Sequence, residues 1–376
     1  MTTAERTLNA LNYIPSEVVC AQDYEQLASR FIPPDRFAYL SGGSGHDLTL
    51  QNNRHIYSDF SLIPRVLRDV SNGNTQIECL GKVMKHPVLL APVAYQTLAH
   101  PEGELATAYA AESTDTCMVA STLSSFTLEQ IAENAGQQRW FQLYFQPNDD
   151  DTFSLIKRAI QAGYKAIVVT VDAAVQTPSI RAIREGFSFP KDVVPANIIN
   201  QQAVEPAVPD ADQSRIFLNY MHHAPTQEKL KRLIAQSSVP VLIKGVLHPD
   251  DARELKALGA AGIIVSNHGG RTIDSAPASL AVLPSIRQAV GDDYPVLLDS
   301  GIRSGSDIFK AIALGADAVL IGRLQVYALS VAGALGVAHM IKLLREELEL
   351  TMAMTGCSSI ADIKKTELYR NLARSS

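Results

Sequence analysis

The sequence predicts an α/β protein of the closed (β/α)8 barrel class, the TIM barrel, and two regularities support that prediction. Eight short apolar runs recur along the chain, and amphipathic helical stretches separate most of them. A doubly wound open sheet is the competing architecture, but no glycine-rich dinucleotide fingerprint follows the first run. The runs are expected to be strands at 87–93, 116–121, 140–145, 166–171, 239–244, 262–266, 295–299 and 317–322.

Residues 1–80 are predicted to form an N-terminal helical cap on this barrel. Helix-like patterns at 23–30 and 47–53 flank a glycine cluster at 41–45 that interrupts them. A single domain over all 376 residues is expected. Within the barrel, amphipathic patterns predict helices at 102–111, 151–162, 249–258 and 306–314.

The fourth unit of the predicted barrel carries a long connection at 188–226 that is partly acidic and contains several Pro and Asn residues. Connections of this length in a compact domain are often lids. Because the segment follows the fourth strand, it is expected to lie over the barrel mouth as a lid. A surface loop without that role is the alternative.

Composition excludes several classes of function. A net charge of −6 provides no basic face for nucleic acid or for a membrane surface. The four cysteines (Cys20, Cys79, Cys117 and Cys357) show no metal-ligand spacing and are interpreted as reduced thiols. The first residues lack the pattern of a secretion signal, and no apolar run approaches the ~20 residues that span a bilayer. A soluble, cytoplasmic protein is expected.

A histidine and an arginine follow the predicted strand at 262–266. His268 and Arg271 stand there with two glycines between them. Side chains at the carboxyl end of a barrel strand point into the mouth where barrel enzymes act. A neutral imidazole can take a proton there, and a guanidinium can hold an anion. A structural histidine in a glycine-rich turn is the alternative.

The last two units of the barrel have the composition of a phosphate site. Gly301 and Arg303 follow the seventh predicted strand, and Gly322 and Arg323 follow the eighth. Glycines allow close approach of a bound group, and free N–H groups at the next helix start favour an anion. The recurring phosphate site of these barrels is built from the same two loops. Two tight turns with surface arginines are the alternative.

Two further ionisable residues end apolar runs, Asp172 after the fourth run and Lys244 after the fifth. A charged group at the end of a buried strand requires a partner. Two such groups on separate strands beside a histidine favour an active site over packing.

The chain closely resembles the FMN-dependent α-hydroxyacid oxidase and dehydrogenase family, which includes glycolate, lactate and hydroxymandelate oxidases. The resemblance covers nearly the whole sequence and rests on several separated motifs. These are FAYLSGGSG (37–45), IPRVLRDV (63–70), APVAYQ (91–96), HPEGELATA (100–108), WFQLY (140–144), VTVD (169–172), IKG (243–245), SNHGGR (266–271), DSGIR (299–303) and IGR (321–323).

The resemblance implies roles in catalysis and substrate binding for five residues. His268 would be the base that removes a proton from the substrate, and Asp172 would orient its imidazole and stabilise the imidazolium. Tyr39 and Tyr144 would hydrogen-bond the substrate, although each could instead be a core aromatic. Arg271 would bind the substrate's carboxylate.

The resemblance also implies FMN as the cofactor. Lys244 would lie by the N1–C2 carbonyl edge of the flavin and stabilise the negative charge of the reduced ring. The residues implied to hold the ring, largely at strand ends, are Ala94, Ser121, Gln142, Thr170 and Ser266. Asp299 would bind the ribityl chain. The residues implied to bind the phosphate are Gly301, Arg303, Gly322 and Arg323.

One position departs from the family pattern. The family places a second substrate arginine seven residues after the aspartate that matches Asp172, and that position is Ser179 here. Loss of one charge-assisted hydrogen bond costs about 1.5–3 kcal/mol. Arg181 could replace the missing group, or Arg271 and Tyr39 could suffice. Alternatively, the substrate lacks a free carboxylate, and lactate and glycolate are then expected to be poor substrates.

The predicted function is FMN-dependent oxidation of a 2-hydroxy acid, or of an ester, amide, peptide or carrier-bound derivative, to the 2-oxo product. Electrons would pass to FMN and then to oxygen or another acceptor. The mixed, acidic composition of 188–226 favours a soluble oxidase over a membrane dehydrogenase. The alternatives are an FMN-dependent isomerase or nucleotide dehydrogenase on a related barrel, and a catalytically degenerate flavin-binding protein. A homotetramer is the assembly that the resemblance implies.

Overall fold

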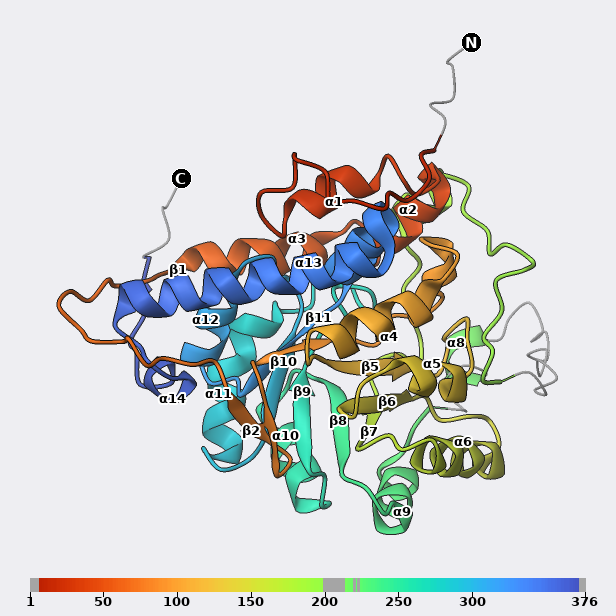
Figure 1. Cartoon of the computed structure of the whole chain (residues 1–376). Coiled ribbons are helices and arrows are strands. Elements are labelled where there is room, and N and C mark those ends of the chain that lie inside the picture. Colours follow the sequence, from red (N-terminus) through yellow and green to blue (C-terminus); the bar gives the residue numbers. More distant parts are fainter. Residues whose placement is uncertain (1–6, 199–213, 219–220, 222–223, 372–376) are drawn as a thin grey trace.

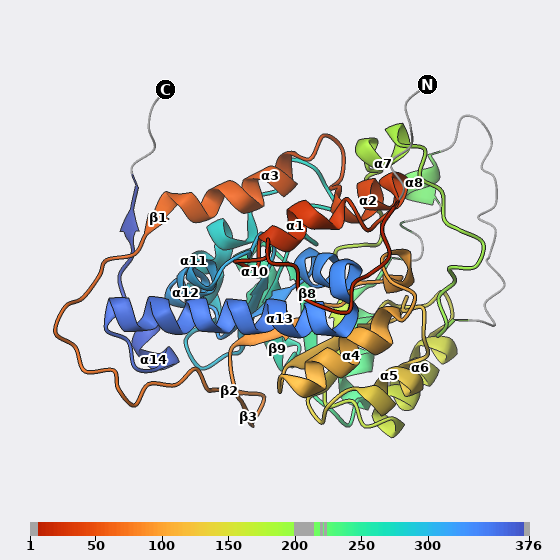
Figure 2. The same ribbon diagram turned by 45° about the horizontal axis from the view of Figure 1, so that its top comes forward.

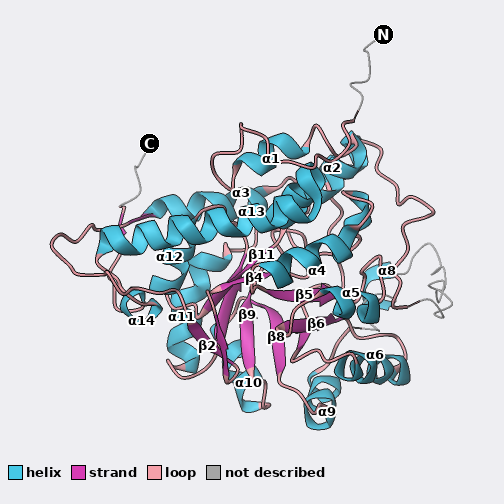
Figure 3. Ribbon diagram, in the orientation of Figure 1, coloured by secondary structure: helices cyan, strands magenta, loops and turns pink. Residues whose placement is uncertain are grey.

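The structure is a computed structural model that describes residues 7–198, 214–218, 221 and 224–371 (Figure 1). Its centre is a closed barrel of eight parallel strands surrounded by helices, and the strands are magenta in Figure 3. The strands are β4 (Val88–Leu90), β5 (Cys117–Ser121), β6 (Arg139–Leu143), β7 (Ile167–Thr170), β8 (Val241–Val246), β9 (Gly262–Val265), β10 (Val296–Asp299) and β11 (Ala318–Ile321). Each predicted apolar run overlaps one of these strands, which confirms the predicted barrel.

Burial explains why these short runs become strands. Every residue of β4, β9, β10 and β11 is buried, as expected for parallel strands that are covered on both faces. The barrel closes where β11 pairs with β4, with Val319 opposite Val88. A register shift between β8 and β9 occurs from Lys244 to Val246, which makes the chain irregular at Gly245.

The barrel helices follow the pattern of the sequence. Helices α4, α6, α10 and α12 agree within two residues at each end with the four helices predicted for the barrel. The helices that cover the barrel include α4 (Gly103–Ser113), α5 (Leu128–Asn134), α6 (Asp149–Gln161), α9 (Gln227–Gln236), α10 (Pro249–Ala257), α11 (Ser279–Val290) and α12 (Gly305–Ala313). Thr127 begins α5 with a reciprocal capping box, in which its side chain and that of Gln130 each accept a backbone N–H.

Both helices predicted for the cap are found, with one more α-helix and a short 3-10 helix at Ile56–Asp59. The α-helices of the cap are α1 (Asp23–Ala28), α2 (Pro34–Ser41) and α3 (Leu48–His55). The additional helix, α2, begins with Pro34, a residue that suits the first helical position. After α3, the short strand β1 (Phe60–Ser61) pairs with β12 (Tyr369–Arg370) near the other end of the chain.

Helix α13 (Arg323–Thr355) packs along α1, α4 and α12 in both views (Figures 1 and 2). Within the described ranges it is the one helix long and apolar enough to cross a membrane. However, 78% of its most apolar window is buried inside the protein. The backbone leaves helical geometry at Ala332 and Gly333, so that two helical segments meet at a kink.

The predicted lid at 188–226 lies partly outside the described residues. The described beginning of the segment packs beside the loop after β5: the side chain of Asn197 accepts the N–H of Leu128 at 2.8 Å and donates to the carbonyl of Thr122 at 3.3 Å. The segment between β7 and β8 also contains α7 (Ile180–Arg184) and α8 (Arg215–Leu218). A lid function for this segment stays a prediction.

Candidate active site

A cavity opens at the carboxyl ends of the barrel strands, where polar side chains follow the buried runs. Its empty volume is about 1180 Å³, including the open space at the mouth. The sequence-predicted residues that line it are Tyr39, Ala94, Ser121, Tyr144, Lys244, His268, Arg271, Asp299, Gly301, Arg303, Gly322 and Arg323. The loops after several strands and the cap therefore converge on one space.

His268 and Asp172 form a hydrogen-bonded pair at one side of this cavity. Nδ1 of His268 lies 3.0 Å from Oδ1 of Asp172, and both side chains are largely buried. Burial raises the pKa of Asp172, but the nearby His268 and Lys244 outweigh burial and hold that pKa below its ordinary value. An ionised carboxylate only accepts hydrogen bonds, so Nδ1 carries the proton and Nε2 is left as the basic nitrogen.

The imidazole of His268 is held neutral by its surroundings. Burial lowers its pKa first, and the ammonium of Lys244 lowers it further, against the opposing charge of Asp172. A neutral imidazole is the form that can accept a proton.

An uncommon backbone conformation orients His268. Its φ is 58°, and Gly269 and Gly270 follow with φ of 65° and 75°. A Cβ at Gly269 would lie 2.6 Å from Arg323, and one at Gly270 would lie 2.7 Å from the backbone of Leu50. Gly270 is therefore required for the close approach of this loop to the cap, and Gly269 leaves room for the guanidinium of Arg323. A left-handed histidine held by such packing is typical of a functional site.

Gly245 makes room for Asp172. Its φ is 104°, and a Cβ there would lie 2.5 Å from the Cβ of Asp172. The irregular register of β8 after Lys244 thus gives the carboxylate its position beside His268.

Lys244 places a buried positive charge in the same cavity. Its Nζ donates to Oγ of Ser266 at 2.9 Å and lies 3.3 Å from Oδ2 of Asp299. Burial lowers the pKa of Lys244, but the carboxylates of Asp299 and Asp172 outweigh burial and raise it above its ordinary value. The ammonium group is therefore charged although only 5% of the side chain is exposed.

Arg271 is positioned by the carboxyl end of α2. Its Nη1 donates to the carbonyls of Tyr39 at 2.9 Å and Gly42 at 3.1 Å, and its guanidinium lies 4.9 Å from the centre of the Tyr39 ring. The last carbonyls of a helix have no partner within the helix, and cations near them are favourable. The remaining N–H groups of Arg271 make no hydrogen bond to a described residue and can bind an anion in the cavity.

An aromatic cluster covers Tyr39 from the side of the segment after α7. The ring of Phe187 stacks on Tyr39 with centroids 4.3 Å apart. Phe189 packs against Tyr39 at 5.2 Å and against Tyr95 at 5.0 Å. These contacts fix two tyrosines that line the cavity.

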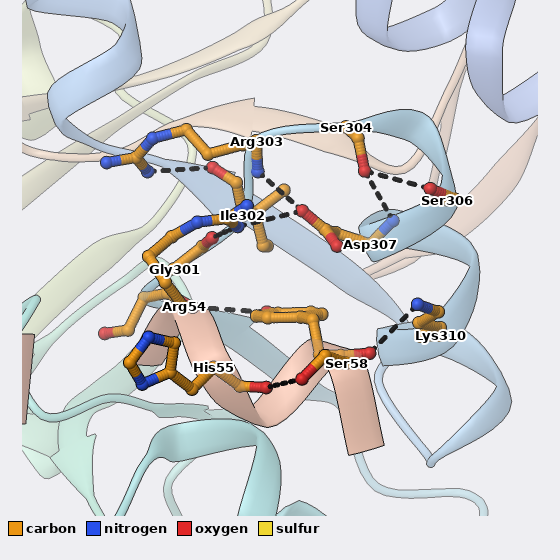
Figure 4. A network of polar contacts seen from close by, with 12 residues as sticks. Arg54, His55, Ser58, Gly301, Ile302, Arg303, Ser304, Ser306, Asp307 and Lys310 are labelled. Atoms are coloured by element: carbon orange, nitrogen blue, oxygen red, sulfur yellow. Dashed lines mark hydrogen bonds and ion pairs between the residues drawn. The ribbon is translucent and has the colours of Figure 1, made fainter. Parts of the chain in front are cut away.

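The network of hydrogen bonds in Figure 4 joins the loop after β10 to the cap. Arg54 of α3 donates to the carbonyl of Gly301 and, at 3.0 Å, to Asp307, which also accepts the N–H of Arg303 at 2.9 Å. Gly301 has a φ of 83°, and a Cβ would overlap the carbonyl of Asn53. Only glycine fits this turn.

The guanidinium of Arg323 is buried without a carboxylate partner among the described residues. It donates to the carbonyls of Leu40 at 3.0 Å, Gly269 at 2.8 Å and Gly42 at 2.7 Å. Burial and the nearby Arg271 lower its pKa to about 10. Arg303, by contrast, pairs with Glu25 at 2.7 Å. A bound anion would stabilise the uncompensated charge of Arg323.

Four predicted residues do not belong to the cavity lining: Asp172, Gln142, Thr170 and Ser266. Asp172 hydrogen-bonds His268, which lines the cavity, and the other three are buried. Arg181 is not brought into the cavity. Its guanidinium binds Asp47 at 2.5 Å instead, so the predicted contact of Arg181 with substrate finds no support. Ser179 caps α7 and does not line the cavity either.

Sequence reasoning missed several residues that line the cavity. These include Arg54, Tyr95, Leu123 and Gln176. Tyr95 stands in the APVAYQ segment with a φ of 53°, which its sequence does not signal. Arg54 comes from the cap, and no local pattern indicates that a cap helix reaches the seventh strand.

The residues of the chain from 28 to 370 match the family described as FMN-dependent dehydrogenase. The chain belongs to this family. An L-lactate oxidase of Alicycliphilus denitrificans is 56% identical over 93% of this chain and 96% of its own. A 4-hydroxymandelate oxidase of Amycolatopsis orientalis is 40% identical over 92% of this chain and 97% of its own. A solved structure of mandelate oxidase has a TM-score of 0.86 at 39% identity and covers 94% of this chain and 99% of that one.

The protein is therefore an FMN-dependent oxidoreductase that acts on CH–OH groups. The lactate and hydroxymandelate oxidases among its relatives favour an oxidase over a dehydrogenase. The two other enzyme classes considered from the sequence, isomerase and nucleotide dehydrogenase, are not supported by these relatives.

The cavity fits FMN in two respects. Gly322 precedes α13 and has no side chain that could cap the first N–H groups of this helix. These N–H groups, together with the uncompensated charge of Arg323, can bind a phosphate. At the other end, Nε2 of Gln142 is buried with no partner among the described residues, while Oε1 accepts from Ser121 at 3.1 Å. An unpaired buried amide N–H requires an acceptor. Because Ser121, the partner of Gln142, lines the cavity, the carbonyl or ring nitrogen of a flavin would be a suitable acceptor.

Proposed function

We propose that the protein is an oxidase that converts a 2-hydroxy acid, or a derivative of one, to the 2-oxo product. One observation carries this proposal: the imidazole of His268, backed by Asp172, lines the same cavity as Lys244 and Arg271. A proton acceptor, a cation for the flavin and a cation for a substrate anion thus surround one space.

His268 is the proposed base. Its free nitrogen Nε2 takes a proton from the substrate, and the ionised Asp172 stabilises the imidazolium that forms. Oxidation of the CH–OH group releases two electrons, and bound FMN supplies their acceptor. Lys244, which lines the same cavity, is the proposed cation whose charge would stabilise the reduced ring. Oxygen is the proposed final acceptor.

Arg271, Tyr39 and Tyr144 are the proposed substrate-binding groups. Arg271 keeps N–H groups available because only Nη1 is used by the carbonyls at the end of α2. Burial raises the pKa of Tyr144, so its hydroxyl stays protonated and can donate a hydrogen bond. Together they would orient a carboxylate or carbonyl against His268.

We propose that the substrate is an ester, amide, peptide or carrier-bound derivative rather than a free acid. Support comes from the loop after β7, where Ser179 stands at the position of the expected arginine and Arg181 is paired with Asp47. One guanidinium, that of Arg271, then faces the substrate's acyl group. L-Lactate is the second candidate, favoured by the L-lactate oxidases among the relatives.

A substrate panel tests these proposals. The yellow holoenzyme would be mixed anaerobically with glycolate, L-lactate and mandelate and with their methyl esters and amides, and flavin absorbance would be followed. Bleaching followed by oxygen uptake is expected. A preference for esters or amides supports the derivative, and a preference for L-lactate supports the second candidate. Flavin that no member bleaches would contradict the oxidase proposal.

Cytoplasmic location and a homotetramer are also proposed, on the resemblance alone. Light scattering of the purified holoenzyme measures the assembly directly, and a mass other than four chains contradicts the tetramer.

A further inference from the structure

Tyr95 is a third tyrosine in the cavity at the carboxyl ends of the barrel strands. It lines this cavity together with Tyr39 and Tyr144, the two tyrosines proposed to bind the substrate. Tyr95 belongs to the loop after β4, in which the family resemblance implied a role for Ala94 but none for Tyr95. Its role therefore has to be inferred from its surroundings.

The hydroxyl of Tyr95 has no hydrogen-bond partner among the described residues, and it is not sealed in the protein. The hydroxyl of Tyr327, by contrast, is fully buried without a partner. A phenol group donates one hydrogen bond and can accept others. The hydroxyl of Tyr95 is therefore available to a polar group of a bound molecule.

Three phenol groups meet at one end of the cavity. Burial raises the pKa of Tyr95, and the nearby phenol of Tyr39 raises it further. The pKa of Tyr144 is raised first by burial and also by Asp172 and the phenols of Tyr39 and Tyr95. Groups affect one another's pKa in this way when they lie close together. Tyr95 and Tyr144 thus stay protonated and can each donate a hydrogen bond.

The backbone of Tyr95 adopts a conformation that is uncommon for a bulky residue. Its φ of 53° and ψ of 47° lie in the left-handed region. Aromatic residues rarely adopt this conformation, whereas glycine adopts it without strain. A side chain that is held against such a preference is typical of a functional site. The conformation therefore favours a functional role for Tyr95 over ordinary packing.

Two hydrogen bonds hold the backbone at Tyr95. Its N–H donates to the carbonyl of Leu123 at 3.1 Å, and the N–H of Gln96 donates to Oε1 of Glu104 at 3.0 Å. The same oxygen accepts the N–H of Ser125 at 3.1 Å. Glu104 of α4 thus joins the loop after β4 to the loop after β5, whose Leu123 also lines the cavity.

The side chain of Glu104 acts as an acceptor for these two loops. It is fully buried, and burial raises its pKa. Its second oxygen, Oε2, has no partner among the described residues. The hydrogen bonds that hold the two loops therefore depend on Oε1 alone, and an amide oxygen in the same place could accept them as well.

The ring of Tyr95 is fixed by Phe189. The two rings meet edge to face with centroids 5.0 Å apart, and Phe189 also packs against Tyr39. Ring packing, the two backbone hydrogen bonds and the left-handed conformation together determine where the hydroxyl of Tyr95 lies.

We propose that Tyr95 is a substrate-binding residue that determines specificity through its hydroxyl, and that Glu104 is a positioning residue for Tyr95. This inference rests on the proposed function, because it takes the cavity as the substrate site. Arg181 is paired with Asp47, whereas Arg271 lines the cavity. A phenol beside Arg271 adds a hydrogen bond without a second positive charge, which suits the carbonyl of an ester or amide.

Tyr95→Phe, which keeps the ring and its packing on Phe189 and removes only the hydroxyl, tests the inference. The rate of anaerobic flavin reduction would be measured against the concentration of the panel member that bleaches the wild-type holoenzyme fastest. Loss of one hydrogen bond is expected to raise the Kd of the substrate about 3- to 10-fold, with a smaller change in the limiting rate. A Kd within about twofold of the wild-type value overturns the inference.

Tyr109→Phe is the matched control, because Tyr109 is an exposed tyrosine of α4 that does not line the cavity. An equal rise of Kd in both variants overturns the inference. FMN affinity, measured by fluorescence titration of the apoprotein, should be the same in Tyr95→Phe as in the wild type. A loss of FMN affinity as large as the loss for the substrate would assign the hydroxyl to the flavin and also overturn it.

Binding of pyruvate and pyruvamide separates this inference from the proposed function, because neither compound has a CH–OH group at C2 to be oxidised. The flavin difference spectrum of the holoenzyme measures their Kd without turnover. Tyr95→Phe should weaken the tighter of the two about 3- to 10-fold, even if no panel member bleaches the flavin and the proposed function fails. An unchanged Kd, or binding of neither compound to the wild type, overturns the inference.

Glu104→Ala tests the positioning role by removing the acceptor for both loops. The Kd of the same ligand should rise, and adding Tyr95→Phe should raise it no further, because the same hydrogen bond is already lost. Glu104→Gln, which keeps an oxygen at Oε1, should restore the wild-type Kd. Additive effects in the double variant would overturn the positioning role. If Glu104→Ala does not fold, Glu104→Asp, whose shorter side chain withdraws the oxygen, takes its place.

Discussion

Nδ1 of His268 lies 3.0 Å from Oδ1 of Asp172, and the two residues come from loops that follow different barrel strands, β9 and β7. The hydrogen bond fixes which nitrogen of the imidazole carries the proton and leaves Nε2 to act on a substrate. The proposed role of His268 as the base depends on this hydrogen bond.

Asp172→Asn is predicted to lower the rate of flavin reduction about 100-fold or more, because an amide does not stabilise the imidazolium that forms on His268. Stopped-flow absorbance under anaerobic conditions measures the rate. FMN binding should be retained, since Asp172 does not line the cavity at the carboxyl ends of the barrel strands. A reduction rate within threefold of the wild type would exclude a role for the carboxylate.

The pH profile of the wild type follows from the direction of one pKa. The pKa of His268 lies below its ordinary value because of burial and Lys244. The neutral base therefore persists as the pH falls past the ordinary histidine value, and kcat/KM should decline only below about pH 6.5. An acid limb centred well above that pH would be incompatible with this environment. Asp172→Asn removes a charge that raises the pKa of His268, and it should therefore move the acid limb of kcat/KM to still lower pH.

Gly245→Ala is predicted to reduce activity by displacing Asp172. The new Cβ would lie 2.5 Å from the Cβ of Asp172, and the φ of 104° is unfavourable for alanine. Gly81→Ala is a matched control, since Gly81 also has a positive φ but a Cβ there meets nothing within 4 Å. Equal losses of flavin reduction rate in both variants would show that the positive φ, and not displacement of Asp172, causes the loss.

Arg323→Met is predicted to weaken FMN binding about 10- to 100-fold, the effect of losing one charge-assisted hydrogen bond to a phosphate. Titration of the apoprotein with FMN, followed by flavin fluorescence, measures the affinity. Arg253→Met on the exposed surface of α10 is the control. Unchanged affinity in Arg323→Met would place the phosphate elsewhere.

Ser179→Arg is predicted to raise kcat/KM for glycolate and L-lactate relative to their esters, because a second guanidinium would bind a free carboxylate. The readout is the ratio of kcat/KM for the free acid to kcat/KM for its ester. Ser285→Arg, on the exposed part of α11, controls for added charge. A ratio that does not change would remove position 179 from substrate recognition.

The barrel could be predicted from the sequence because each strand is a short apolar run. Such a run indicates a buried strand from its own residues, without knowledge of distant contacts. The same is true of Lys244 and Asp299, which end such runs, and of His268, which follows one, so that all three had to meet at the carboxyl end of the barrel. The contributions of Arg54 and Gln176 could not be predicted, since they depend on how the cap and the loop after β7 fold over the mouth. The pairing of Arg181 with Asp47 is likewise a contact between distant segments that neither local sequence indicates.

Anaerobic flavin reduction by His268→Gln tests the central claim most directly. The variant should bind FMN like the wild type and yet bleach at least about 100-fold more slowly with a substrate that reduces the wild-type enzyme. Reduction at the wild-type rate would show that another group takes the proton and would contradict the assignment of His268 as the base.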